Sequence, residues 1–149
     1  MQTTTFLELH RSRILSDAAS GAASAPRYAA AGAAETAQRL DTLFDELVTA
    51  VDGHDLASIV GYARSLARAR HAGGYDLSEV QVAINALEES VWRRVFADAP
   101  RDLAGAALRE ASTVLGAAKD ALAREYVVLA SSTHAPSLDV GALFTGAAS

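Results

Sequence analysis

Apolar residues recur at helical spacing along most of the chain. The clearest pattern covers residues 35–52, where apolar side chains occur at steps of three and four and acidic side chains lie opposite them. A second helix is predicted from Asp55 to His71, with basic residues near its end, where they complement the helix dipole. The same spacing predicts a helix that ends near Gly21. The alanine-rich stretch 27–34 is compatible with a helix or with a loose connection.

Turn signals mark the start of the next helix. Gly73 and Gly74 favour the left-handed backbone conformation that often ends a helix. Asp76 and Glu79 have the spacing of a capping box, in which each side chain binds a free backbone N–H of the first turn. We therefore predict a helix that begins at this capping box and runs to about Asp98.

The last predicted helix begins after Pro100 and runs without interruption over residues 102–132. At 1.5 Å per residue it would be about 46 Å long, which is longer than a compact domain of this size needs. Leucines seven residues apart, with alanines between them, form one narrow stripe that is typical of close pairing between two helices. The stripe predicts a dimer interface made of Leu108, Ala111, Leu115, Ala118, Leu122 and Leu129.

The composition supports an all-helical fold. Half of the residues are apolar, but only 6% are aromatic and 34 are alanine, so the helices are expected to pack closely. A length of 149 residues fits one domain, and few features of short strands are present. We expect an all-α bundle of five to six helices over residues 1–133. A short tail, 134–149, follows, and its apolar side chains suit docking on the same domain.

Charge and cysteine usage exclude several classes of function. The chain has 13 basic and 18 acidic side chains, a net charge of -5, which is opposite to what a nucleic-acid phosphate backbone attracts. The absence of cysteine excludes disulfides, thiolate nucleophiles and cysteine metal sites. Uncharged stretches are shorter than the roughly 18 apolar residues that cross a membrane. We expect a cytoplasmic protein that binds neither nucleic acid nor membrane.

The sequence contains no motif typical of catalysis or metal binding. No spacing among the histidines places two ligands on one helical face, and His10 is interpreted as a packing histidine. No phosphate-binding glycine loop or serine-nucleophile motif occurs. We expect neither enzymatic activity nor a cofactor, haem included. The four histidines are His10, His54, His71 and His134.

One helical face carries groups that suit a small molecule. Gln81, Asn85 and Glu88 form a polar row that leads to Trp92, and amide and carboxyl groups beside an aromatic ring can orient a ligand. These four residues are the candidate ligand pocket. The alternative interpretation is a solvated helix face with ordinary ion pairs.

Other aromatic and basic side chains are interpreted as structural. Aromatic residues at helical spacing usually belong to the core, and basic residues late in a helix usually remain solvated. The first group is Tyr62, Tyr75, Trp92 and Phe96. The second group is Arg64, Arg68 and Arg70.

The surroundings of His54 suggest an alternative chemistry. The sequence around His54 is similar to that of the phosphoacceptor helix of sensor histidine kinases. The matching residues are His54-Asp55-Leu56 and Gly61-Tyr62-Ala63. In that pattern the histidine lies inside a long helix, whereas His54 follows Gly53 at a predicted helix start. A histidine phosphotransfer module that uses His54 is therefore kept as an alternative.

Residues 46–96 carry a likeness to a known family. The matching features are the helix that includes Leu47 and Val51, the Asp52-Gly53 break, and the run Gly74-Tyr75-Asp76-Leu77-Ser78-Glu79-Val80. Glu88 and Trp92 fit the later part of the pattern. The segment resembles the N-terminal sensor domain of RsbT co-antagonist proteins, the RsbR and RsbRD type found in stressosomes and at the head of some sensor kinases.

The resemblance implies a globin-like helical fold without haem that dimerises through its terminal helices and regulates an output domain. No such output domain occurs within these 149 residues, so we expect either a stand-alone copy that signals by association or a fragment of a longer protein. The expected function is a non-enzymatic, dimeric sensory or regulatory domain that acts through its long last helix. A regulatory protein and a small-molecule ligand are the expected further partners. The alternative is a helical scaffold or adaptor without a ligand.

Overall fold

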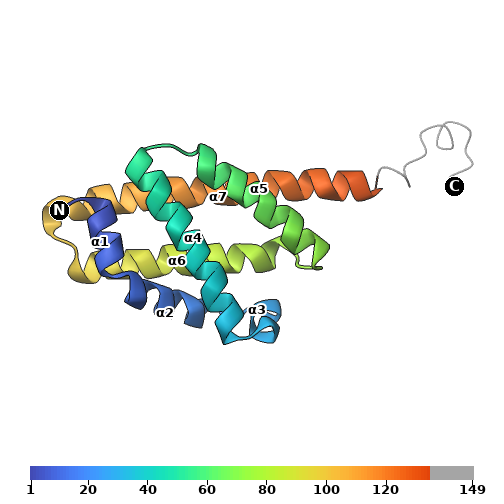
Figure 1. Cartoon of the computed structure of the whole chain (residues 1–149), viewed down its shortest axis with the longest axis horizontal. Helices are drawn as coiled ribbons and strands as arrows, with labels where there is room; N and C mark the ends of the chain where they lie inside the picture. Colours follow the sequence, from blue (N-terminus) through green and yellow to red (C-terminus); the bar gives the residue numbers. More distant parts are fainter. Residues whose placement is uncertain (135–149) are drawn as a thin grey trace, which may run out of the picture.

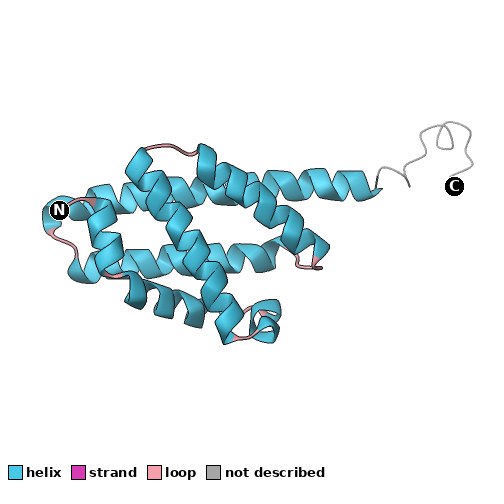
Figure 2. Cartoon of the chain, viewed as in Figure 1, coloured by secondary structure: helices cyan, strands magenta, loops and turns pink. Residues whose placement is uncertain are grey.

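The computed structural model describes residues 1–134, which form seven helices and no strand (Figures 1 and 2). The predicted all-α class and the long C-terminal helix are confirmed, and the number of helices is higher than the predicted five to six. Of the predicted tail, 134–149, His134 is the last residue of the final helix, and the rest lies outside the described residues. The helices are α1 (Thr3–Leu9), α2 (Arg11–Ala22), α3 (Pro26–Ala31), α4 (Ala33–Gly53), α5 (Ala57–Ala72), α6 (Leu77–Asp98) and α7 (Arg101–His134).

The first predicted helix is broken in two at His10. The backbone of His10 leaves the helical region, with φ -104° and ψ 11°, although neither glycine nor proline is present there. The break lets Arg11 reach α4, where its guanidinium group lies 2.7 Å from carboxylate oxygens of both Asp41 and Asp45. His10 packs its ring 4.5 Å from that of Phe6, as expected for a packing histidine. A contact with α4, distant in sequence, thus accompanies this change of direction.

Two glycines at positive φ separate other helices. Gly32, with φ 93°, ends α3 and precedes α4, which resolves the stretch 27–34 as a short helix and a turn. Gly74 lies between α5 and α6 and has φ 81°, as predicted. Gly73 has φ -80°, so the left-handed conformation predicted for it is wrong. The capping box of Asp76 and Glu79 is confirmed at the start of α6.

The helices pack in two layers. Helices α6 and α7 run antiparallel along the molecule, and α1, α2, α4 and α5 lie across them (Figure 1). Helix α5 packs chiefly on α7, α2 packs chiefly on α6, and α4 contacts both layers. Small buried residues such as Ala63 and Ala67 on α5 leave room for this close packing. A buried bond from the Ser90 hydroxyl to the Ile14 carbonyl, 2.6 Å, joins α6 to α2.

The leucine and alanine stripe of α7 lies in the core of a single chain, which corrects the predicted dimer interface. Four of its six residues are fully buried against the chain's own helices, and none of these four can meet a second copy without opening the fold. Leu108 and Leu129 are half-buried. The helical pairing that the stripe predicts is therefore supplied within one chain by α4, α5 and α6. The four buried residues are Ala111, Leu115, Ala118 and Leu122.

No helix within residues 1–134 combines the length and the apolar character that a membrane crossing requires.

Candidate functional site

All four tyrosines of the chain gather at the end of the bundle from which α7 projects. They come from four different parts of the chain: Tyr28 from α3, Tyr62 from α5, Tyr75 from the turn before α6, and Tyr126 from α7. Three arginines lie among them. We call this group the arginine–tyrosine site; its residues are Arg27, Tyr28, Arg39, Tyr62, Arg70, Tyr75 and Tyr126.

Tyr75 lies at the centre of the arginine–tyrosine site. Its ring is 5.5 Å from that of Tyr28, and the two rings meet edge to face. The guanidinium carbons of Arg27, Arg39 and Arg70 lie 5.8, 5.7 and 5.6 Å from the Tyr75 ring centroid, which is the range of cation–π contacts. Arg39 also donates a hydrogen bond of 2.8 Å to the Tyr75 hydroxyl. Three cations therefore surround one aromatic ring.

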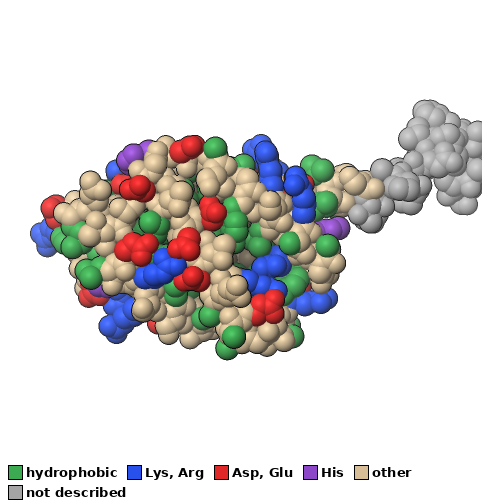
Figure 3. Space-filling view, viewed as in Figure 1, with side chains coloured by type: hydrophobic (Ala, Val, Ile, Leu, Met, Phe, Trp, Pro, Cys, Tyr) green, Lys and Arg blue, Asp and Glu red, His purple; other side chains and the backbone are tan. Residues whose placement is uncertain are grey.

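Among residues 1–134, only one of these three arginines has a carboxylate partner. Arg39 pairs with Glu35, one turn earlier on α4. Within residues 1–134, Arg27 and Arg70 form no ion pair with an acidic side chain, and the Nε of Arg70 is buried without a hydrogen-bond partner. Basic side chains gather over α5 and the lower end of α4 in Figure 3, whereas acidic ones crowd the middle and left of that face. The site is thus locally positive in an acidic chain.

A cavity of about 20 Å³ opens beside these arginines. Its polar lining comes from Tyr28, Arg39, Tyr62 and Arg70, on α3, α4 and α5. Its remaining walls are apolar and come from α4, α5 and α6. The apolar lining residues are Leu40, Leu43, Leu66, Val80, Ala83 and Ile84.

Burial raises the pKa of three of the tyrosines. Loss of hydration raises the pKa of Tyr28, against a hydrogen bond with Arg70 and the positive charge of Arg70. It also raises the pKa of Tyr62, against the positive charge of Arg70, and the pKa of Tyr126 to about 12. Like any tyrosine at neutral pH, these residues carry a protonated hydroxyl group that can donate a hydrogen bond.

The arginine–tyrosine site contacts α7 directly. The hydroxyl of Tyr126 donates a hydrogen bond of 3.0 Å to the backbone carbonyl of Tyr75, and the Tyr126 ring lies edge-on to His71 at 5.6 Å. One residue earlier on α7, Glu125 accepts a hydrogen bond of 3.1 Å from Arg68. Beyond Tyr126 the end of α7 projects from the bundle (Figure 1); Val127 is 64% exposed, whereas Leu129 is still half-buried. Tyr126 therefore lies at the boundary between the packed and the projecting parts of α7.

The predicted ligand pocket lies elsewhere, on the side of α6 that faces α7. Lys119 of α7 binds both Asn85 Oδ1 and Glu88 Oε1 at 3.1 Å, and the Trp92 indole donates to Ser112 at 3.0 Å. These contacts join the two helices and occupy polar groups that the sequence assigned to a ligand. Gln81 is half-buried in the same row.

Two residues predicted to be core are on the surface instead. Phe96 is 74% exposed and Trp92 is 42% exposed, one turn apart on α6. Tyr62 and Tyr75 are half-buried, and Arg64 and Arg68 are exposed as predicted. Arg70, in contrast, turns toward the tyrosines and is not a solvated helix end.

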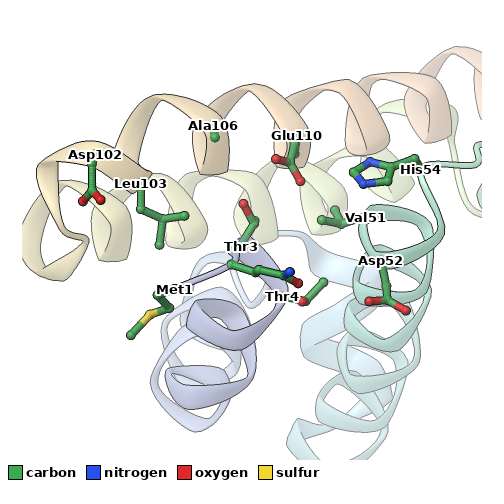
Figure 4. A pocket seen from close by; sticks show the side chains of 11 residues that line it. Met1, Thr3, Thr4, Val51, Asp52, His54, Asp102, Leu103, Ala106 and Glu110 are labelled. Carbon is green, nitrogen blue, oxygen red and sulfur yellow. The ribbon is translucent and has the colours of Figure 1, made fainter.

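A larger hollow lies at the opposite end, between α1, the end of α4 and the start of α7 (Figure 4). Its volume is about 390 Å³, and its lining includes His54, Asp102 and Glu110. Within residues 1–134, no group of three or more acidic or histidine side chains has an arrangement that could hold a metal ion. His54 is exposed at the end of α4 in a left-handed conformation, φ 48°, and not inside a long helix as in kinase phosphoacceptor helices.

The sequence alone did not reveal the arginine–tyrosine site, because its members are up to about 100 residues apart and follow no local motif. One usable signal was present. Arg27 precedes the stretch 28–34, which contains no acidic residue, whereas Arg39 has Glu35 one turn before it. No protein-family model, no curated protein and no solved structure matches the chain.

Proposed function

We propose that the chain is a non-enzymatic sensory or regulatory module in which the arginine–tyrosine site controls the projecting end of α7. The observation that carries this proposal is the hydrogen bond from Tyr126 to the Tyr75 carbonyl. It joins the site to the last buried position of α7 within the described residues. A change in the site can therefore reach the segment of α7 that leaves the bundle.

The physical basis is a difference in stability along α7. Up to Tyr126 the helix is held by the core, and after it Val127 and Val128 are largely exposed. Helical turns with few tertiary contacts are closer to the balance between folded and frayed states than turns packed in the core. A ligand that favours one arrangement of Tyr75 shifts this balance by its difference in affinity for the two states. The projecting turns would then be the output of the module.

The resemblance to RsbT co-antagonist sensor domains belongs to the same proposal. Under this proposal, the chain has a globin-like arrangement without haem, works inside the cell, and binds a regulatory protein through α7. The buried stripe changes the expected mechanism, because α7 cannot slide along a second copy without leaving its own core. Movement of the projecting end takes the place of a change in dimer register.

The first test compares two tyrosine-to-phenylalanine variants. Tyr126→Phe removes the hydrogen bond to Tyr75, whereas Tyr62→Phe removes a hydroxyl from the same site that has no bond to α7. We expect faster amide hydrogen exchange over residues 127–132 in Tyr126→Phe, by about three- to tenfold, because one hydrogen bond contributes about 1 kcal/mol. Tyr62→Phe should leave this exchange unchanged. Equal exchange in both variants and the unchanged protein would contradict the proposed coupling.

The expected homodimer needs a surface other than the stripe. Phe96 and Trp92 protrude from α6, and added side-chain atoms at Gly105 and Gly116 of α7 would meet open space. Ser112, which binds Trp92, shares one helical face with these two glycines. Aromatic side chains that protrude next to glycines, which have no side chain, suit a self-complementary contact. We therefore propose that a second copy docks on this face.

Phe96→Glu tests this dimer surface. The substitution should halve the mass in light scattering without loss of helical signal, because Phe96 is exposed and contributes little to the core. Leu9→Glu is the matched control, since Leu9 is 68% exposed on α1. A dimer that survives Phe96→Glu, or an unchanged protein that is a monomer, would refute this surface.

A further inference from the structure

We infer that the arginine–tyrosine site binds a small oxyanion, the carboxylate of a small organic acid or a phosphate group. The inference rests on the proposed function in one respect, because it names the ligand of the site assigned to sensing there. Three features of the site support it: its local charge, its hydrogen-bond donors and its space.

The balance of charge favours an anion. The guanidinium groups of Arg27, Arg39 and Arg70 lie within 5.8 Å of one ring centroid, and Glu35 is the one acidic side chain paired with them in the described part of the chain. The whole chain carries a net charge of -5, so this excess of positive charge is local. Like charges repel one another, and the neutral Tyr75 ring that the three groups share does not cancel their charge. An anion bound beside Arg39 and Arg70, which line one cavity, would reduce the repulsion.

The site also offers unused donors. The Nε of Arg70 is buried without an acceptor, and burying an unsatisfied donor costs about 1–3 kcal/mol. The planar guanidinium group matches the two oxygens of a carboxylate or phosphate, which lysine cannot do in the same way. Tyr28 and Tyr62 line the same cavity, and a tyrosine hydroxyl group is a hydrogen-bond donor at neutral pH. An oxyanion would satisfy these donors together.

The space limits the size of the group. A cavity of about 20 Å³ holds about one water-sized group, so it admits one oxygen of an oxyanion and not a whole metabolite. The remaining walls are apolar and include Leu43, Leu66 and Ile84, so an oxygen in the cavity finds its donors only on the polar side. Arg27 is exposed beside Tyr75, outside this lining, where it can meet the part of the ligand that stays outside. A carboxylate and a phosphate can each place one oxygen in the cavity, so size alone does not choose between them.

The tyrosines report directly on binding. All four belong to the site, so tyrosine difference absorbance of the full chain follows this site, while fluorescence of Trp92, the one tryptophan, follows another face. The probes are inorganic phosphate, acetate and butyrate at constant ionic strength, with chloride as the reference anion. We expect a saturable tyrosine signal with at least one oxyanion and none with chloride. Stronger binding of butyrate than of acetate would identify a carboxylate with an apolar tail, and preference for phosphate would identify a phosphate group.

Matched arginine variants complete the test. Arg70→Gln should weaken binding at least tenfold, because a charge-assisted hydrogen bond contributes about 1.5–3 kcal/mol. Arg64→Gln removes the same charge from an exposed position of the same helix and should leave the affinity unchanged. If Arg70→Gln loses its helical signal, Arg27→Gln, at an exposed position, takes its place and should also weaken binding. The absence of a saturable signal with every oxyanion, or equal affinity in the Arg70 and Arg64 variants, would overturn the inference.

The binding experiment and the exchange experiment on α7 test two independent claims. Binding is read from the tyrosines without reference to the projecting helix, whereas the Tyr126→Phe exchange experiment needs no anion. Binding without coupling would sustain the oxyanion and refute the regulatory role. Coupling without binding would sustain the regulatory role and refute the oxyanion.

Discussion

The substitution Leu115→Asp is expected to unfold the protein. Leu115 is fully buried on α7 in the middle of the contacts with other helices. Truncation of a buried leucine to alanine costs about 2–5 kcal/mol, and a buried carboxylate without a partner costs more. Small domains are stable by only about 5–15 kcal/mol. Far-ultraviolet circular dichroism should therefore show loss of helix. If the stripe were an interface between copies, the same substitution would leave a helical monomer.

Val127→Asp is the matched control. It introduces the same charge on the same helix at a position that is 64% exposed, so the helical signal and the midpoint of urea unfolding should stay close to those of the unchanged protein. A helical Leu115→Asp protein of half the native mass would show that the stripe is an interface between copies. That result would contradict the core described above.

Alkaline pH is expected to unfold the protein in a steep transition. Burial raises the pKa of Tyr28, Tyr62 and Tyr126 in the folded state, for Tyr126 from 10.0 to about 12. The stabilisation from this neutral form is complete below pH 10, and it is lost as pH rises toward 12, because the unfolded chain releases these protons first. Several tyrosines act in the same direction. Stability should therefore fall with a slope greater than one ionising group can give.

Tyrosinate absorbance and circular dichroism, followed together against pH, measure this transition. We expect ionisation of the buried tyrosines to coincide with loss of helix. In Tyr126→Phe the fall in stability between pH 10 and 12 should be shallower, because one of the shifted groups is absent. Ionisation of Tyr28, Tyr62 and Tyr126 near pH 10 with an unchanged helical signal would contradict the burial of the site.

Much of the fold could be predicted because the sequence signals of a helix lie in residues that are close together in the chain. The apolar periodicity of α4, the capping box at Asp76, and the uninterrupted pattern of α7 each reside in neighbouring residues. The break at His10 could not be predicted in this way. It coincides with contacts between Arg11 and the carboxylates of α4, which are about 30 residues away in the sequence.

The stripe on α7 illustrates a different limit. Periodicity shows which face of a helix is buried, but it does not show which helix buries it. Leu115 and Leu122 have the spacing of a dimer seam, and helices of the same chain cover them. The same reasoning overestimated burial at Phe96, where spacing fits the core and the structure leaves 74% of the residue exposed.

The candidate site was missed because its residues meet only in three dimensions. Tyr28 and Tyr126 belong to helices at opposite ends of the sequence, and no spacing relates them. Arg70 fits the pattern of a solvated helix end equally well from the sequence. Its inward position depends on Tyr75, which the turn after α5 places next to it.

Control of α7 by the arginine–tyrosine site is tested most directly by one distance. The chain has no cysteine, so cysteines at exposed Ser131 and Ala97 carry a unique pair of spin labels, one on the projecting end of α7 and one at the far end of α6. Their distance distribution is measured by pulsed electron paramagnetic resonance in the otherwise unchanged protein, in Arg70→Gln and in Arg64→Gln. We predict a shifted or broadened distribution in Arg70→Gln alone. Three superimposable distributions would show that the projecting helix does not respond to the site.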